Sequence, residues 1–183
     1  MNTHNEIYSI DIAGLKRSLP IIEIAPGLKI AVLNILGDTE LVESAAKHLN
    51  SLLNQLDYDV IVTPEAKSIP LAYALSVISK KPYVVLRKTQ KLYMGKCLQA
   101  ETVSITTGKP QTLFLDNKDR KLIANSNILL LDDVISTGST SEAMRKLLNI
   151  AEGNIVGEAA ILTEGDKSQW EHIYSLGHLP VFG

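Results

Sequence analysis

The chain has 183 residues and a formal net charge of −2, and 45% of its residues are hydrophobic against 21% charged. This length suits one domain, and the composition is too apolar for a disordered chain and too interrupted by polar residues for a membrane protein. The small net charge also excludes a polycation built to bind nucleic acid through overall attraction.

The first 36 residues combine an apolar run over 19–22 with a turn over 25–27. They lack the basic and apolar regions of a signal peptide, and the chain has a single cysteine, Cys97, so we expect a cytoplasmic protein without disulfides. Asp38 then marks a helix start. The apolar residues that follow share one helical face, which predicts packing on a core: Leu41, Val42, Ala45, Ala46, Leu49, Leu52, Leu53 and Leu56.

Residues 59–63 predict a buried strand, 64–68 a tight loop, 71–79 a helix and 82–86 a second strand. A strand, a helix and a strand within about 30 residues form a βαβ unit with parallel strands.

A second unit of this kind follows, with a strand over 127–131, a helix over 139–150 and a strand over 155–162. The alternation predicts an α/β fold, an open and mainly parallel twisted sheet with helices on both faces. Between the two units, residues 91–110 show no compact pattern apart from a strand-like run over 102–107. A long unpatterned segment inside a compact domain is usually functional, and we expect a flexible loop that acts as a lid.

The segment from 66 to 100 contains seven of the 18 positive residues and none of the 20 acidic ones. Such a stretch requires an anionic ligand or a solvated surface, and for Lys80 and Lys81 the solvated surface is favoured. The seven residues are Lys67, Lys80, Lys81, Arg87, Lys88, Lys91 and Lys96.

The strongest motif is LLLDDVISTGST over residues 129–140, in which a buried strand ends in Asp132 and Asp133 and a loop of small hydroxyl residues leads into a helix. Ligands of open α/β sheets bind beyond the carboxyl ends of the strands. Hydroxyls and backbone N–H groups at a helix start bind anions, and Gly138 allows a positive φ. The two acids can accept hydrogen bonds from sugar hydroxyls or hold a hydrated Mg²⁺. Together these residues suit a sugar phosphate.

Simpler explanations exist for single parts of this motif. Ser139 with Glu142 forms a capping box, which by itself explains the helix start. Two other phosphate-binding patterns are absent, because no glycine precedes the pair Lys67 and Ser68 as a P-loop requires, and no G-x-G-x-x-G occurs.

Residues 129–140 resemble the phosphoribosyl pyrophosphate (PRPP) motif of type I phosphoribosyltransferases. The resemblance covers most of the chain, because residues 63–68 resemble the family's pyrophosphate loop, Arg87 and Lys88 its basic strand end, and residues 91–110 its flexible catalytic loop. The sequences EAKS and RKTQKL are similar to the adenine branch of the family, with the xanthine branch next.

The resemblance implies a role for each motif. Asp132 and Asp133 would hold the ribose hydroxyls, and with Lys91 they are the predicted catalytic residues. The 5-phosphate and ribose would contact Val134, Ile135, Ser136, Thr137, Gly138, Ser139 and Thr140. The pyrophosphate would contact Ala66, Lys67, Arg87, Lys88 and Lys91, with Lys96 as a further candidate, in a loop that often contains a non-proline cis peptide.

The resemblance further implies a single domain with a hood over the base, formed by residues 1–36. Ile21, Ile22 and Glu164 are the predicted base contacts, although Glu164 and Asp166 are equally well explained as caps of a following helix. Mg²⁺ would arrive with PRPP without a direct protein ligand, and the protein would form a homodimer that binds neither nucleic acid nor a membrane.

The implied reaction is attack of a purine ring nitrogen on C1 of PRPP, which releases pyrophosphate and yields a nucleotide in purine salvage. Adenine enzymes carry an acid in the loop, whereas residues 103–107 contain none and Glu101 lies on the other side, so the sequence identifies no general base. Gly165 after Glu164 disfavours xanthine, because the xanthine branch has a lysine there. The open alternatives are hypoxanthine, guanine, xanthine or orotate as the base, or a PRPP-sensing regulator without catalysis. Only 36 residues precede the first helix, which is too few for a winged-helix domain.

Four histidines show no metal spacing, and Cys97 has no neighbouring base that would make it a nucleophile: the histidines are His4, His48, His172 and His178. We expect Trp170 to pack near the C-terminal strand, with stacking on the base as the alternative.

Overall fold

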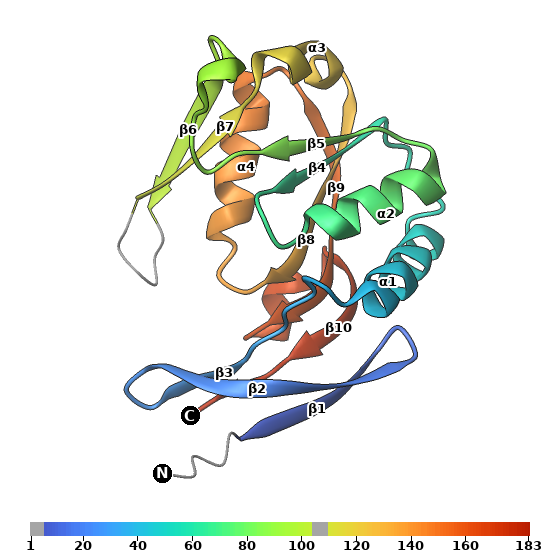
Figure 1. The fold of residues 1–183 in the computed structure, drawn as a ribbon, viewed down its shortest axis with the longest axis vertical. Helices are drawn as coiled ribbons and strands as arrows, with labels where there is room; N and C mark the ends of the chain where they lie inside the picture. Colours follow the sequence, from blue (N-terminus) through green and yellow to red (C-terminus); the bar gives the residue numbers. More distant parts are fainter. Residues whose placement is uncertain (1–5, 104–109) are drawn as a thin grey trace.

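The protein folds around a five-stranded parallel sheet, as shown by a computed structural model that describes residues 6–103 and 110–183 (Figure 1). The strand order is β10-β9-β8-β4-β5, and every neighbouring pair is parallel. The strands are β4 (Val60–Pro64), β5 (Tyr83–Leu86), β8 (Asn127–Ile135), β9 (Asn154–Glu164) and β10 (Tyr174–Leu179). The predicted α/β fold is confirmed.

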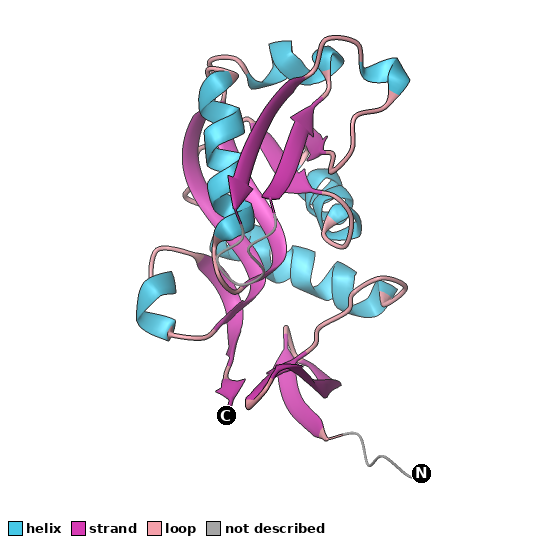
Figure 2. Cartoon of the chain, turned by 90° about the vertical axis from the view of Figure 1, so that its left-hand side faces the viewer, coloured by secondary structure: helices cyan, strands magenta, loops and turns pink. Residues whose placement is uncertain are grey.

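Helices cover both faces of this sheet because successive residues of a strand point to opposite sides (Figures 1 and 2). On one face, Ile61 and Leu129 pack with α1 (Thr39–Leu52) and α2 (Ile69–Ser79). On the other, Val62 and Leu130 pack with α4 (Ser139–Ile150). Both strands therefore contain continuous apolar runs, Val60–Val62 and Ile128–Leu131, as expected for parallel strands inside a sheet.

Helix α1 begins where the sequence predicts, because the Asp38 side chain accepts a hydrogen bond from the backbone N–H of Leu41 at 3.2 Å. The predicted apolar face is buried over most of its length. Leu52 is the exception within the helix and is 45% exposed, although Leu49 before it and Leu53 after it are buried.

The N-terminal segment forms a second, antiparallel sheet at one end of the molecule (Figure 1). Its strands are β1 (Ile7–Ile12), β2 (Leu15–Ala25), β3 (Leu28–Ala31) and the C-terminal β11 (Val181–Phe182). The predicted turn lies between β2 and β3, where Gly27 has a φ of 74°. Ile12, Leu19 and Ala31 join the core on the α1 side, so this sheet is packed onto the rest of the domain.

A β-hairpin replaces much of the segment for which the sequence predicts no compact pattern. Its strands are β6 (Leu98–Val103) and β7 (Pro110–Leu115), and the hairpin lies over α4 (Figure 2). Ala100, Leu113 and Leu115 are buried with the α4 residues. The prediction was wrong here because, among the side chains of β6 that the structure describes, Ala100 alone is buried, so the alternation is weak. The rest of the predicted strand, residues 104–107, lies outside the described residues.

The remaining elements are short: η1 (Leu92–Met94), η2 (Asn117–Asp119), α3 (Arg120–Ile123) and η3 (Lys167–Trp170). Among the described residues, no helix is long and apolar enough to cross a membrane.

Candidate functional site

The turn from β8 into α4 forms a small concave site at the carboxyl edge of the sheet. Gly138 adopts a φ of 73° between the strand and the helix, which is the left-handed conformation that the sequence predicted for it. A cavity of about 30 Å³ is lined by Asp132 and by residues 134–141. The structure therefore brings together all seven predicted residues of this loop, and it adds Ser141, which is buried in the first turn of α4.

Strand β8 is longer than predicted, because it continues through both acids to Ile135. The predicted strand over 127–131 is therefore too short: Asp132 and Asp133 lie within β8 and do not end it. Strand β9 pairs with β8 as far as Thr163, so the backbone at Asp132 is paired with Ala160 inside the sheet.

Asp132 and Asp133 are half-buried neighbours, and a carboxylate oxygen of Asp132 accepts the backbone N–H of Asp133 at 2.8 Å. Burial raises the pKa of Asp132 well above its usual value, and the negative charge of Asp133 raises it further. Contact with the Ser68 side chain acts in the opposite direction. The acid pair thus gains from a ligand that supplies hydroxyl donors or positive charge.

The loop between β4 and α2 follows β4, the strand that pairs with β8 and therefore lies beside the acid pair. The peptide bond between Glu65 and Ala66 is cis, as the resemblance implied. Ser68 is buried, and its hydroxyl accepts a hydrogen bond from Thr63 at 2.8 Å. Lys67 is exposed and its Nζ lies 3.5 Å from the carbonyl oxygen of Leu33. This arrangement leaves the exposed Ala66 and Lys67 at the carboxyl edge of the sheet.

Glu65 connects this loop to the basic end of β5. Its Oε2 accepts hydrogen bonds from Arg87 Nε at 3.1 Å and from the backbone N–H of Lys88 at 3.0 Å. These bonds lower the pKa of Glu65, and the bond from the Lys88 backbone has the larger effect. Arg87 is also held by its backbone, which exchanges two hydrogen bonds with Phe114 of β7. Sequence reasoning missed Glu65, and its place directly before the predicted cis peptide was the available signal.

Three predicted base contacts are less well placed by the structure. Ile21 and Ile22 lie on β2 in the N-terminal sheet, where Ile22 is 45% exposed. Glu164 ends β9 and is only 7% exposed, and burial raises its pKa. Asp166 accepts hydrogen bonds from the N–H and hydroxyl of Ser168, so it caps η3.

Other candidate residues lie at the edge of this site or have structural partners. Lys91 and Lys96 are exposed on either side of η1. His178 is bonded through both ring nitrogens, to the Thr163 hydroxyl at 2.9 Å and the Gly165 carbonyl at 3.0 Å. His4 lies outside the described residues. Among those described, no three His, Cys, Asp or Glu side chains cluster as metal ligands.

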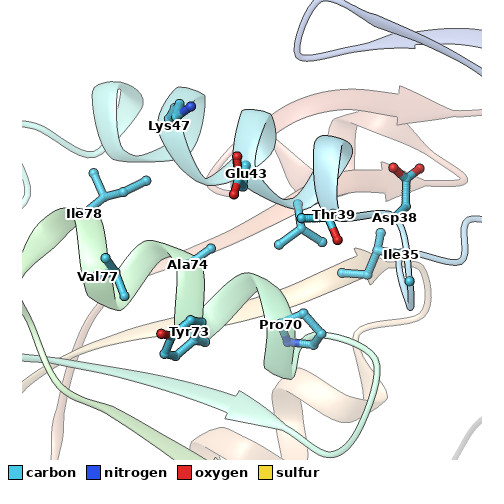
Figure 3. Close-up of a pocket in the computed structure, with 12 residues that line it drawn as sticks. Ile35, Asp38, Thr39, Glu43, Lys47, Pro70, Tyr73, Ala74, Val77 and Ile78 are labelled. Atoms are coloured by element: carbon cyan, nitrogen blue, oxygen red, sulfur yellow. The ribbon is translucent and has the colours of Figure 1, made fainter.

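A larger cavity lies elsewhere, in a groove of about 520 Å³ between α1 and α2 (Figure 3). Pro70, Tyr73 and Val77 form one wall, and Glu43 and Lys47 lie on the other. None of the residues predicted to bind a ligand lines this groove. Its mainly apolar wall offers no cradle for a phosphate, so the polar carboxyl edge is the better candidate for the functional site.

A model of one known protein family matches most of this chain, including the candidate site. The family model described as phosphoribosyl transferase domain matches residues 33–176. The adenine phosphoribosyltransferase of Thermosipho africanus is 32% identical over 149 residues, which are 78% of this chain and 84% of that protein. The hypoxanthine/guanine phosphoribosyltransferase of Methanothermococcus okinawensis is 32% identical over 117 residues, covering 64% and 60% of the two chains.

A regulatory protein is also among the relatives. The purine biosynthesis transcriptional repressor PurR of Bacillus subtilis is 31% identical over 143 residues, which are 78% of this chain and 49% of the repressor. The chain therefore spans about half the length of this relative and 60% of the Methanothermococcus okinawensis enzyme.

Solved structures show the same fold at low sequence identity. The adenine phosphoribosyltransferase of Thermoanaerobacter pseudethanolicus has a TM-score of 0.68 at 20% identity, over 94% of this chain and 95% of that chain. The enzyme of Giardia lamblia, solved with 9-deazaadenine, has a TM-score of 0.68 at 18% identity, over 94% and 93%.

Proposed function

The chain belongs to the phosphoribosyl transferase family, and from this premise we propose that it transfers the 5-phosphoribosyl group of PRPP to a purine base, with adenine as the first candidate. The products would be a purine nucleotide, AMP in the case of adenine, and pyrophosphate. This reaction would serve purine salvage.

One observation supports this proposal above the others: the order of polar groups along the carboxyl edge of the sheet. Residues 136–140, called the phosphate loop below, follow β8, and the acid pair lies within β8. The loop with Lys67 follows the adjacent strand β4, and the basic pair Arg87 and Lys88 follows β5. PRPP has the same order, with a 5-phosphate at one end, ribose hydroxyls in the middle and pyrophosphate at the other end. The two anion-binding elements therefore suit the two ends of one ligand.

The proposed mechanism follows from where charge develops. The bond from C1 to pyrophosphate breaks with oxocarbenium character on the ribose, and negative charge grows on the departing group. Arg87, which is held by Glu65, would stabilise that charge with little reorganisation, and Lys67 and Lys88 would add positive charge from the neighbouring loop and strand end. Asp132 and Asp133 would orient the ribose through its hydroxyls and would face the positive charge that develops on the ring.

Within residues 91–110, the part before β6, residues 91–97, is proposed to close over the site and exclude water, which competes with the base for the reactive carbon. Lys91 and Leu92 support this role, because both are exposed next to the basic strand end. An apolar side chain in that position gains a partner when the segment moves onto a bound substrate.

Mg²⁺ is proposed to enter with PRPP. The donor chemistry fits, since Asp132 and Asp133 offer carboxylate oxygens of the kind that a hydrated Mg²⁺ binds, and positive charge relieves the repulsion within this pair. When bound, the ion would neutralise part of the charge on the pyrophosphate.

The base is proposed to lie between the N-terminal sheet and the end of β9, where Ile21, Ile22 and Glu164 are the candidate contacts. A buried carboxyl with a raised pKa, as in Glu164, suits a hydrogen bond to a ring nitrogen. Hypoxanthine and guanine are the alternative bases, because enzymes named for them are among the relatives.

A PRPP-binding regulator is the second candidate function. Two observations favour it: the similarity to the Bacillus subtilis repressor and the absence of an acid in residues 103–107. The two functions are distinguished by incubating the protein with PRPP, Mg²⁺ and each purine base in turn. Release of pyrophosphate supports the enzyme, whereas PRPP binding without turnover on any base supports the regulator.

A homodimer is proposed with α2 in its contact surface. Helix α2 has no charged residue, yet Tyr73 and Val77 are 60% and 59% exposed in the single chain, and a helix that is apolar all round is normally buried. Glu43 and Lys47 on the facing wall of the groove have opposite charges, which suits a self-complementary contact about a twofold axis. The single cysteine supports the cytoplasm as its location.

A further inference from the structure

Trp170, the only tryptophan of the chain, is partly buried and lies against the loop at Gly138. A Cβ atom placed on Gly138 would lie 3.2 Å from Cη2 of the Trp170 ring and 3.5 Å from its Cζ3. Gly138 is the residue whose positive φ turns the chain from β8 into α4. The edge of the indole ring therefore contacts the loop at its most constrained backbone position.

The indole ring is fixed from its other side as well. Its Nε1–H donates a hydrogen bond of 2.8 Å to the backbone carbonyl of Glu164, at the end of β9. The ring also packs with Ile135, Ala160 and Ile173 in a small separate core. Ile135 is the last residue of β8, so the same ring contacts both sides of the turn that forms the loop.

The helix that carries the ring is itself anchored to the sheet. Asp166 caps η3 through Ser168, and the N–H of Gly165 donates to the carbonyl of Leu179 on β10. His178 adds a second bond from β10, to the carbonyl of Gly165. A continuous set of bonds thus leads from the edge strand to the indole ring and from there, by contact, to Gly138.

We propose that Trp170 is a positioning residue for the phosphate loop: it holds the turn at Gly138 in the conformation that binds the 5-phosphate. This inference rests on the proposed function and adds to it a residue that would touch no substrate. A cavity of about 30 Å³ can only receive a phosphate oxygen if its backbone donors are fixed, and the ring is the largest side chain supporting them from behind.

If Trp170 positions the phosphate loop, replacing it should affect binding of the 5-phosphate half of PRPP and not of the pyrophosphate half. The pyrophosphate side uses Lys67, Arg87 and Lys88, which Trp170 does not contact in the interactions above. Replacing the ring should therefore weaken ligands that carry a 5-phosphate and leave pyrophosphate binding unchanged. A residue needed only for folding would weaken both or neither.

The experiment measures binding of ribose 5-phosphate and, separately, of inorganic pyrophosphate with Mg²⁺ by calorimetry. Trp170→Leu removes the ring, Trp170→Phe keeps an aromatic edge without the N–H, and Tyr58→Leu is the matched control. Tyr58 is a buried aromatic residue that precedes β4, at the amino end of that strand and away from the carboxyl edge of the sheet. Circular dichroism and thermal melting establish that each variant is folded.

We expect Trp170→Leu to bind ribose 5-phosphate at least about tenfold more weakly, the size of effect seen when supporting groups of a binding site are removed. Trp170→Phe should lie between this variant and the wild type, and it decides the matter if the leucine variant does not fold. Tyr58→Leu should lose stability without changing either affinity. In the wild type, ribose 5-phosphate should shift the emission of Trp170, and pyrophosphate should not.

Unchanged ribose 5-phosphate binding in a folded Trp170 variant, or an equal loss for both ligands, overturns the inference and leaves the proposed function standing. A wild-type protein that binds neither ribose 5-phosphate nor PRPP overturns the proposed function, and the inference with it.

Discussion

The Oε2 atom of Glu65 lies 3.1 Å from Nε of Arg87 and also accepts the backbone N–H of Lys88. One carboxylate thus holds the Arg87 side chain and the backbone of Lys88 together at the end of β5. Both side chains of the pair are partly exposed, so its value lies in orientation more than in stability.

Replacing Glu65 by Gln should therefore impair PRPP use while leaving the protein folded. The amide keeps an acceptor for Lys88 but loses the ion pair with Arg87, so we expect the KM for PRPP to rise about tenfold and the KM for the base to stay constant. Steady-state kinetics with each substrate varied in turn measures this. Glu6→Gln, which breaks the exposed pair with Lys29, is the control. An equal rise in both KM values would contradict the orienting role.

The acid pair should be required for PRPP and costly for the empty protein. Asp132→Asn combined with Asp133→Asn should abolish PRPP binding, as measured by calorimetry, and should leave the circular dichroism spectrum unchanged. Retained PRPP affinity would refute the assignment of the motif.

The same pair predicts how stability depends on pH. The folded protein holds the proton of Asp132 more tightly than the unfolded chain does, because the pKa is raised in the fold. Its contribution to stability is therefore complete below the ordinary Asp pKa and is lost as the pH rises through the raised value. Asp132→Asn lacks this loss, so its melting temperature should exceed that of the wild type at neutral pH and match it in acid. A wild-type protein that is the more stable of the two at neutral pH would contradict the raised pKa.

Gly138→Ala should combine a backbone cost with a contact to Trp170. A non-glycine residue at this φ costs about 1–2 kcal/mol, and the new methyl group would lie 3.2 Å from the indole ring. Gly14→Ala is the matched control, since Gly14 has a φ of 79° in the turn after β1 but open space around it. Both variants should lose stability in denaturant titrations, Gly138→Ala the more because of its added contact, and only Gly138→Ala should lose ribose 5-phosphate binding. A loss of binding in both would point to a global effect.

The proposed dimer predicts that a charge on the outer face of α2 yields a monomer. Val77→Glu places a carboxylate on an exposed apolar position, where it costs little in the monomer and much in a dry contact. Sedimentation velocity should show the wild type at twice the mass of the variant. A monomeric wild type would refute this contact surface.

Much of this fold is predictable from sequence because the parallel strands are continuous apolar runs and Asp38 and Gly138 mark the helix starts. The phosphate loop is also predictable, because its residues are consecutive and therefore form a motif that can be recognised in the sequence. The hairpin over α4 was missed because Ala100 gives a weak alternation signal, and the bounds of β8 were missed because acids rarely continue a buried strand. Glu65 and Trp170 act through residues distant in sequence, at Arg87 and Gly138, and no local pattern predicts such contacts.

The proposed transferase activity is tested by mixing the protein with PRPP, Mg²⁺ and adenine and measuring pyrophosphate and AMP together. We expect the two products to form in equal amounts, neither to form without the base, and the variant with both Asp132→Asn and Asp133→Asn to form none. Absence of both products with adenine and with every other purine base, by a protein that binds PRPP, would contradict the enzyme and leave the regulator.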